Sequence, residues 1–229
     1  MQKNTMLRVC LAVNSVVRKQ IWKCAEIALL SGAMTMAMIA GCSTASAQQT
    51  IWPSTAVPAT VDGGPDGPVE LGVSFKSDVA GTITGIRFYK SAANTGIHRG
   101  HLWSSSGALL AAVTFTTETA SGWQQANFSA PVSIMANTVY VASYQSTVGH
   151  WSVNWNYFAY GGANNGVLHA LQNGHGAPDG VWGGAGTFPT HTNASNYWID
   201  VVFGSSGGGV APSITSQPEI GRASCRERV

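Results

Sequence analysis

Short segments in which apolar and polar side chains alternate recur between residues 69 and 203, and this pattern is the strongest constraint on the fold. Gly, Asn, Ser and Pro separate the segments, as they do in turns between β-strands. No stretch in this region has the 3.6-residue apolar period of an amphipathic helix. We therefore expect an all-β domain with strands over Val69–Phe75, Gly81–Tyr89, Gly100–Trp103, Leu109–Thr116, Gly122–Phe128, Val132–Ile134, Thr138–Tyr144, Trp151–Tyr157 and Tyr197–Phe203.

The alternation also predicts which side chains face the core. Within Gly81–Tyr89, Ile83 and Arg87 fall on one face, while Ile86 and Phe88 fall on the other. Asp200 falls on the less apolar face of the last strand. Two sheets packed face to face bury such alternating sets, so we expect an antiparallel β-sandwich, either jelly-roll or immunoglobulin-like. The glycine-rich segment 161–196 is expected to form long loops that pack on the sandwich.

The N-terminal 47 residues have the pattern of an export signal. Positive charges precede the mostly apolar segment Ala25–Ala40, which is expected to form a signal helix and is too short for a comfortable membrane span. Two cleavage sites compete. Ala45–Ala47 before Gln48 is a signal-peptidase site, which we favour, whereas cleavage before Cys42 would leave a lipidated N-terminus. We expect an exported protein, extracellular or on the cell surface, with an outer-membrane lipoprotein as the alternative and no membrane span in the mature chain.

The C-terminal end divides into three parts. The sandwich is expected to span residues 48–203. Residues 204–218 combine a Gly/Ser linker with a sequence typical of the start of an immunoglobulin-like repeat. Residues 219–229 (EIGRASCRERV) match the translation of a sequencing adapter, and we interpret them as an artefact. The chain is therefore expected to be a fragment of a longer multidomain protein.

Charge and cysteine usage exclude some classes of function. Between Gln48 and Pro218 there are four basic and seven acidic residues, a formal net charge of −3. Nucleic-acid binding is not expected, because it requires clustered Lys and Arg. The segment 48–203 contains no cysteine, so disulfides, thiol nucleophiles and cysteine-based metal sites are not expected there.

Seven ordered motifs, from VELGVSF at Val69–Phe75 to NYWIDVVF at Asn196–Phe203, resemble domain-of-unknown-function family 4082. The resemblance spans roughly residues 50 to 203. It implies a bacterial extracellular β-sandwich module that occurs beside immunoglobulin-like, fibronectin-like and carbohydrate-active domains. The family has no established catalytic residues, so the resemblance transfers none to this chain.

The sequence contains no motif of a catalytic nucleophile, phosphate-binding loop or dinucleotide fold. A glycosidase pair of Glu118 with Asp200 is compatible with the spacing, but we interpret the few acids as solvated. The six histidines lack the spacing of metal ligands, and we expect them to be scattered on the surface. Asp62, Asp66 and Glu70 are a candidate site for a structural Ca²⁺, with a plain turn as the favoured interpretation, and no other cofactor is expected.

Aromatic residues are the best candidates for ligand contacts. In the expected strand Trp151–Tyr157, alternation places Trp151, Val153, Trp155 and Tyr157 on the core face. The opposite face would present amide and imidazole groups, which suit sugar hydroxyls, while exposed aromatic rings stack on sugar CH faces. The candidate ligand-binding residues are Trp182, Tyr160, Asn154, Asn156 and His150.

We therefore predict a non-catalytic extracellular or cell-surface module that binds polysaccharide or a cell-surface glycan, or that displays neighbouring domains. Two alternatives stay open. One is an accessory domain of a polysaccharide-degrading enzyme, or such an enzyme itself. The other is an adhesion or spacer domain with no ligand of its own.

Overall fold

A computed structural model describes residues 48–205 of the chain. The expected signal peptide, the lipidation site Cys42, the linker beyond residue 205 and the tail at 219–229 lie outside the described residues. Within 48–205, no helix is long and apolar enough to cross a membrane.

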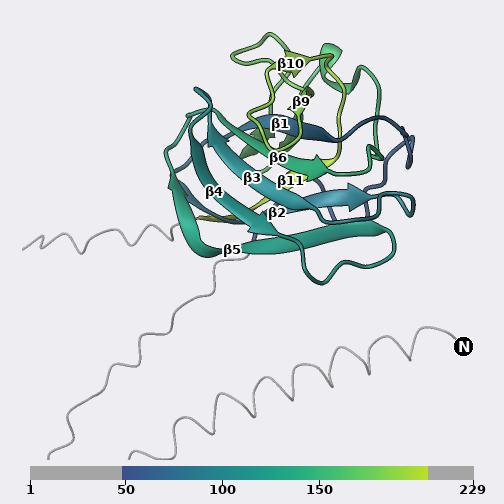
Figure 1. Cartoon of the computed structure of the whole chain (residues 1–229). Coiled ribbons are helices and arrows are strands. Elements are labelled where there is room, and N and C mark those ends of the chain that lie inside the picture. The colour runs from purple at the N-terminus through teal and green to yellow at the C-terminus, as the bar shows by residue number, and fades with distance from the viewer. Residues whose placement is uncertain (1–47, 206–229) are drawn as a thin grey trace, which may run out of the picture. The chain divides into compact units, whose positions relative to one another are not determined.

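The described residues form two antiparallel sheets, as predicted (Figure 1). The larger sheet has the order β10–β9–β1–β6–β3–β4, and β8 pairs with both β1 and β7. The smaller sheet has the order β11–β2–β5. The strands are β1 (Val69–Ser77), β2 (Gly81–Lys90), β3 (Arg99–Ser104), β4 (Leu109–Thr114), β5 (Gly122–Ile134), β6 (Tyr140–Ser146), β7 (Ala163–Asn165), β8 (Leu168–Ala170), β9 (Val181–Gly184), β10 (His191–Thr192) and β11 (Ile199–Ser205).

The core lies between the two sheets and follows the predicted alternation in most strands. Leu71, Val73 and Phe75 alternate along β1 and are buried against the smaller sheet, which contributes Phe88 and Val201 among others. Phe88 of β2 stacks on Tyr144 of β6 with ring centroids 4.2 Å apart. Because burial of a large side chain contributes about 1.5–3 kcal/mol, this shared apolar layer stabilises the sandwich without disulfides.

A β-bulge in β2 makes one predicted facing wrong. Ile83 is buried in the same core as Ile86 and Phe88, although strict alternation places it on the opposite face. In the register of β2 against β11, Gly85 pairs with Val202 and Ile83 pairs with Phe203, so Thr84 is an extra residue in β2 that reverses the alternation there. Gly85 sits where a Cβ would lie 2.5 Å from the carbonyl oxygen of Ala126, so the bulge requires glycine.

The prediction that Asp200 is solvated is also wrong. Asp200 is completely buried, because the segment before β1 covers the outer face of the smaller sheet. Its carboxylate accepts hydrogen bonds from the backbone N–H groups of Ile51 and Trp52, at 2.8 and 3.2 Å. Arg87 of β2 donates to the same carboxylate at 2.6 Å.

The expected strand Trp151–Tyr157 is not continuous. Val153 and Asn154 form isolated bridges, and the chain then turns into a short 3₁₀-helix at Tyr157–Ala159. Asn156 adopts a left-handed conformation with φ of 54°, which ends the extended stretch. Trp151 and Val153 are buried as predicted, but Trp155 is exposed because the turn directs it out of the core.

Candidate functional site

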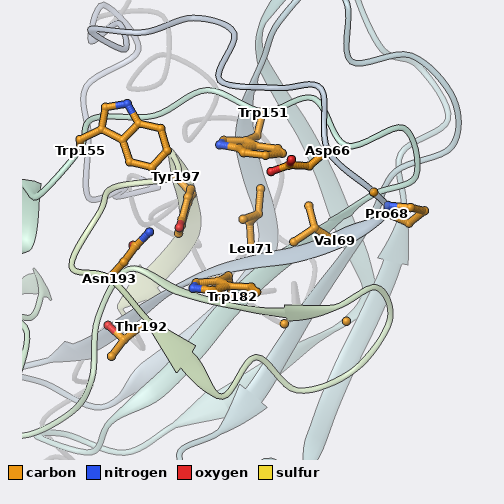
Figure 2. Close-up of a pocket in the computed structure, with 13 residues that line it drawn as sticks. Asp66, Pro68, Val69, Leu71, Trp151, Trp155, Trp182, Thr192, Asn193 and Tyr197 are labelled. Carbon is orange, nitrogen blue, oxygen red and sulfur yellow. The ribbon is translucent and has the colours of Figure 1, made fainter.

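A pocket of about 580 Å³ opens beside β1 and β9 at one end of the larger sheet. Figure 2 shows aromatic rings on several sides of it, with Leu71 and Val69 of β1 forming an aliphatic wall. Pockets of this volume accommodate small ligands and are typically apolar with a few polar groups. The lining residues are Asp66, Gly67, Pro68, Val69, Leu71, Trp151, Trp155, Trp182, Gly183, Gly184, Thr192, Asn193 and Tyr197.

Strand pairing positions Trp182 at the edge of the pocket. Trp182 of β9 lies opposite Leu71 of β1 on one side and opposite His191 of β10 on the other. The indole stacks on the His191 ring with centroids 4.6 Å apart and an interplanar angle of 30°. Trp182 is 39% exposed, so this cross-strand contact supports a ring that the core does not fully bury.

Trp155, Trp151 and Tyr197 supply the other aromatic surfaces. Trp155 is 56% exposed, whereas Trp151 and Tyr197 are buried walls. The indole Nε1 of Trp151 is buried and has no hydrogen-bond partner in the described residues, although buried indole N–H groups usually have one. In Figure 2 this nitrogen is at the end of the ring nearer to Trp155 and Tyr197.

Asn193 and Tyr197 form a polar contact at the pocket. Burial raises the pKa of the Tyr197 hydroxyl to about 12, against a lowering effect of its hydrogen bond with Asn193. Tyr197 therefore stays neutral at physiological pH. Asn193 Oδ1 accepts a hydrogen bond from the backbone N–H of Ser195, which fixes its side chain.

The loop that carries Asp66 is held by a close backbone crossing. The backbone N–H of Asp66 donates to the carbonyl of Gly149 at 2.8 Å. Gly149 has φ of 70°, and a Cβ there would lie 1.9 Å from the carbonyl oxygen of Asp66. Only glycine permits this approach, and the crossing sets the position of Asp66 at the pocket. The Asp66 carboxylate is exposed and has no hydrogen bond or ion pair within residues 48–205.

The structure brings only one of the five predicted ligand residues, Trp182, to the pocket. Tyr160 is 91% exposed but does not line it. Asn154 is used internally, since its Oδ1 accepts hydrogen bonds from the backbone N–H of Ala59 and from Trp198 Nε1. Asn156 begins the 3₁₀-helix, and His150 pairs with Asp62 at 2.9 Å.

Sequence reasoning missed Trp155 and Asp66 as pocket residues. The period-two pattern assigned Trp155 to the core because no local signal marked the turn at Asn156. Asp66 was considered only as a calcium ligand. The DGGPDG sequence around it does signal a turn before a strand.

The acids of the alternative enzyme hypothesis have separate partners. Glu118 contacts Lys90 at 2.7 Å and His98 at 2.8 Å, while Asp200 is paired with Arg87. Burial lowers the pKa of His98, although Glu118 opposes this shift. Glu118 thus does contact a histidine. That histidine is fully buried, and neither residue lines the aromatic pocket.

The candidate calcium ligands are not gathered into one cluster. Glu70 is completely buried and accepts hydrogen bonds from Ser143 and from the backbone N–H of Gly186, with His101 2.8 Å away. Asp62 is engaged with His150. Within the described part of the chain, no three His, Cys, Asp or Glu side chains are grouped as metal ligands. The expectation that acids and histidines lie at the surface is wrong for Glu70, Asp179, His98 and His101.

Comparison with protein families shows which family the residues around the pocket resemble. A family model described as "Domain of unknown function (DUF4082)" matches residues 55–199, which include every residue that lines the pocket. A comparison with curated proteins finds no match to this chain.

Proposed function

The chain belongs to the DUF4082 family of domains of unknown function, and on that premise we propose that it is a non-catalytic module that binds a saccharide in the aromatic pocket. The observation that carries the proposal is the exposure of two indoles, Trp155 and Trp182, at a pocket of about 580 Å³. Burial of large aromatic rings is strongly favourable. Two half-exposed tryptophans at one concave site therefore favour a ligand that covers them.

The composition of the pocket supports a saccharide as that ligand. Sugar rings present CH faces that stack on indoles and hydroxyls that require hydrogen-bond partners. Trp155 and Trp182 offer the ring faces, and Asn193 and Thr192 are polar side chains in the lining. Gly183 and Gly184 of β9 line the pocket with backbone alone, because glycine has no side chain. The volume is of the order needed for one or a few sugar units.

The proposal also places the protein outside the cell, where polysaccharides are abundant. The export signal expected in residues 1–47 supports this placement. We retain a lipid anchor as the alternative form of attachment. A role in displaying neighbouring domains is compatible with glycan binding.

Affinity electrophoresis and pull-down on a panel of soluble and insoluble polysaccharides test the proposal. We expect the chain to be retained by at least one polysaccharide, and Trp182→Ala or Trp155→Ala to weaken retention at least about tenfold. Tyr160→Ala is the matched control, because it removes an exposed aromatic ring outside the pocket. Retention on no polysaccharide, or equal loss with Tyr160→Ala, would contradict the proposal. Thermal unfolding of each variant excludes loss of the fold.

A further inference from the structure

The charged side chain that lines the aromatic pocket is negative. Among its described lining residues, Asp66 is the one carboxylate, and there is no Lys, Arg or His. The carboxylate of Asp66 is unpaired within residues 48–205, whereas the nearby Asp62 is paired with His150. In Figure 2 the oxygens of Asp66 lie next to the Trp151 ring, at the side of the pocket formed by β1.

Aromatic rings and a carboxylate attract the same kind of group. The face of an indole carries a partial negative charge, so an ammonium group over it is stabilised by a cation–π interaction. Trp151, Trp155, Trp182 and Tyr197 surround the pocket that Asp66 also lines. The segment 48–218, with its formal charge of −3, adds no repulsion against a cation.

We propose that the pocket selects a sugar with a free, protonated amino group, such as a glucosamine unit, with the ammonium beside Asp66 and the ring on Trp155 or Trp182. This inference rests on the proposed saccharide binding and specifies its ligand class. An N-acetylated sugar has lost the charge, and an acidic sugar is repelled by Asp66. Neutral sugars retain the stacking contribution alone.

Three soluble tetrasaccharides test this inference: a glucosamine oligomer, its fully N-acetylated counterpart and a neutral glucose oligomer. Isothermal titration calorimetry with the purified chain at about pH 5 keeps the amino groups of the glucosamine oligomer protonated, because neighbouring oxygen atoms make them weaker bases than lysine, and leaves aspartates generally ionised. We expect the glucosamine oligomer to bind roughly tenfold more tightly than the other two. Salt at about 1 M should reduce this preference, because exposed charges are screened.

Asp66→Asn is the decisive variant, since it removes the charge with almost no change in shape at an exposed position. It should abolish the preference, so that the glucosamine oligomer binds no more tightly than the neutral oligomer. Asp62→Asn is the matched control, because it removes a nearby carboxylate that does not line the pocket. Equal affinity of the wild-type chain for all three oligomers, or a preference that survives Asp66→Asn, would overturn this inference while saccharide binding stands. Binding to none of the three oligomers would also overturn this inference, and saccharide binding itself is then decided by the polysaccharide panel.

Discussion

Trp182 and His191 stack across the β9–β10 pair, with ring centroids 4.6 Å apart and an interplanar angle of 30°. The two residues are direct partners in the register. One face of the Trp182 indole is therefore occupied by the imidazole, while the indole also lines the pocket. A ring fixed in this way loses less conformational entropy on binding than a free one.

His191→Ala should weaken saccharide binding although His191 does not line the pocket. Without the imidazole, Trp182 gains rotamer freedom, and we expect a loss of about three- to tenfold in affinity with little change in thermal stability. Calorimetric titration against the best-retained polysaccharide measures the effect. His175→Ala is the control, because it removes an exposed histidine that is not stacked on Trp182. In the Trp182→Ala background His191→Ala should have no further effect, and independent losses would argue against support through the indole.

Gly149→Ala should disturb the pocket through the backbone of Asp66. The new Cβ would lie 1.9 Å from the Asp66 carbonyl oxygen, in addition to the strain of an alanine at φ of 70°. We expect a loss of more than about 1 kcal/mol in the free energy of unfolding, together with weaker ligand binding.

Gly174→Ala separates the clash with the Asp66 carbonyl from the strain of an alanine at positive φ. Gly174 also has a positive φ, of 79°, but a Cβ there would meet nothing within 4 Å. Gly174→Ala should therefore lower the free energy of unfolding through the strained φ alone, and it should leave ligand affinity unchanged. Equal losses in urea unfolding and in binding for the two variants would mean that the crossing at Asp66 is unimportant.

The sequence was sufficient to predict the sandwich because most strands carry uninterrupted alternation. Leu71, Val73 and Phe75 fall on one face by period alone, and the structure buries them. The prediction for Ile83 is wrong because a bulge adds Thr84 to β2 relative to β11, and Gly85 is the one sequence signal of that bulge. A single extra residue reverses every facing beyond it.

The pocket was harder to predict because long-range pairing assembles it. Trp182, Trp155 and Asp66 come from three separate segments, and strand registers or loop crossings bring them together. The burial of the carboxylates of Glu70 and Asp200 could not be predicted from the sequence either. Glu70 and Asp200 lie under loops whose paths depend on the whole fold, and their hydrogen bonds compensate for lost hydration.

Arg87→Met should destabilise the fold by about 3 kcal/mol, because it leaves the buried Asp200 carboxylate without its cationic partner. Arg87 also donates to the carbonyl of Trp52 at 2.8 Å and lies 4.5 Å from the centroid of the Trp123 ring. Urea unfolding measures the loss. Arg99→Met is the matched control, since Arg99 is exposed and has no ion pair in the described residues, and it should change stability by less than about 0.5 kcal/mol. Similar losses for both variants would contradict a special role for the Arg87–Asp200 pair.

Asp179 should make the stability of the fold depend on pH in an unusual direction. Its side chain is completely buried, and its Oδ1 accepts hydrogen bonds from the backbone N–H groups of Ser74 and Gly180, at 2.9 and 2.7 Å. Oδ2 has no partner in the described residues. Burial raises the pKa of Asp179 well above its ordinary value of 3.8, against the lowering effect of those hydrogen bonds.

An acid whose pKa is raised on folding favours the folded state while it is protonated. Its contribution is present at low pH and is lost as the pH rises from the ordinary value through the raised one. Asp179→Asn keeps the Oδ1 acceptor and cannot ionise. The free energy of unfolding of the wild-type chain, relative to Asp179→Asn, should therefore fall as the pH rises above 3.8. Burial lowers the pKa of His98, whose contribution is lost as the pH falls below 6.5, but both proteins share it and the difference cancels it.

Urea unfolding of both proteins across this pH range measures the difference. Asp66→Asn is the control, because it neutralises an exposed aspartate that does not contact Asp179. If the wild-type and Asp179→Asn curves ran parallel, Asp179 would have the same affinity for its proton in the folded and unfolded chains. Burial without a partner for Oδ2 would then cost nothing, which is contrary to the desolvation of a carboxylate.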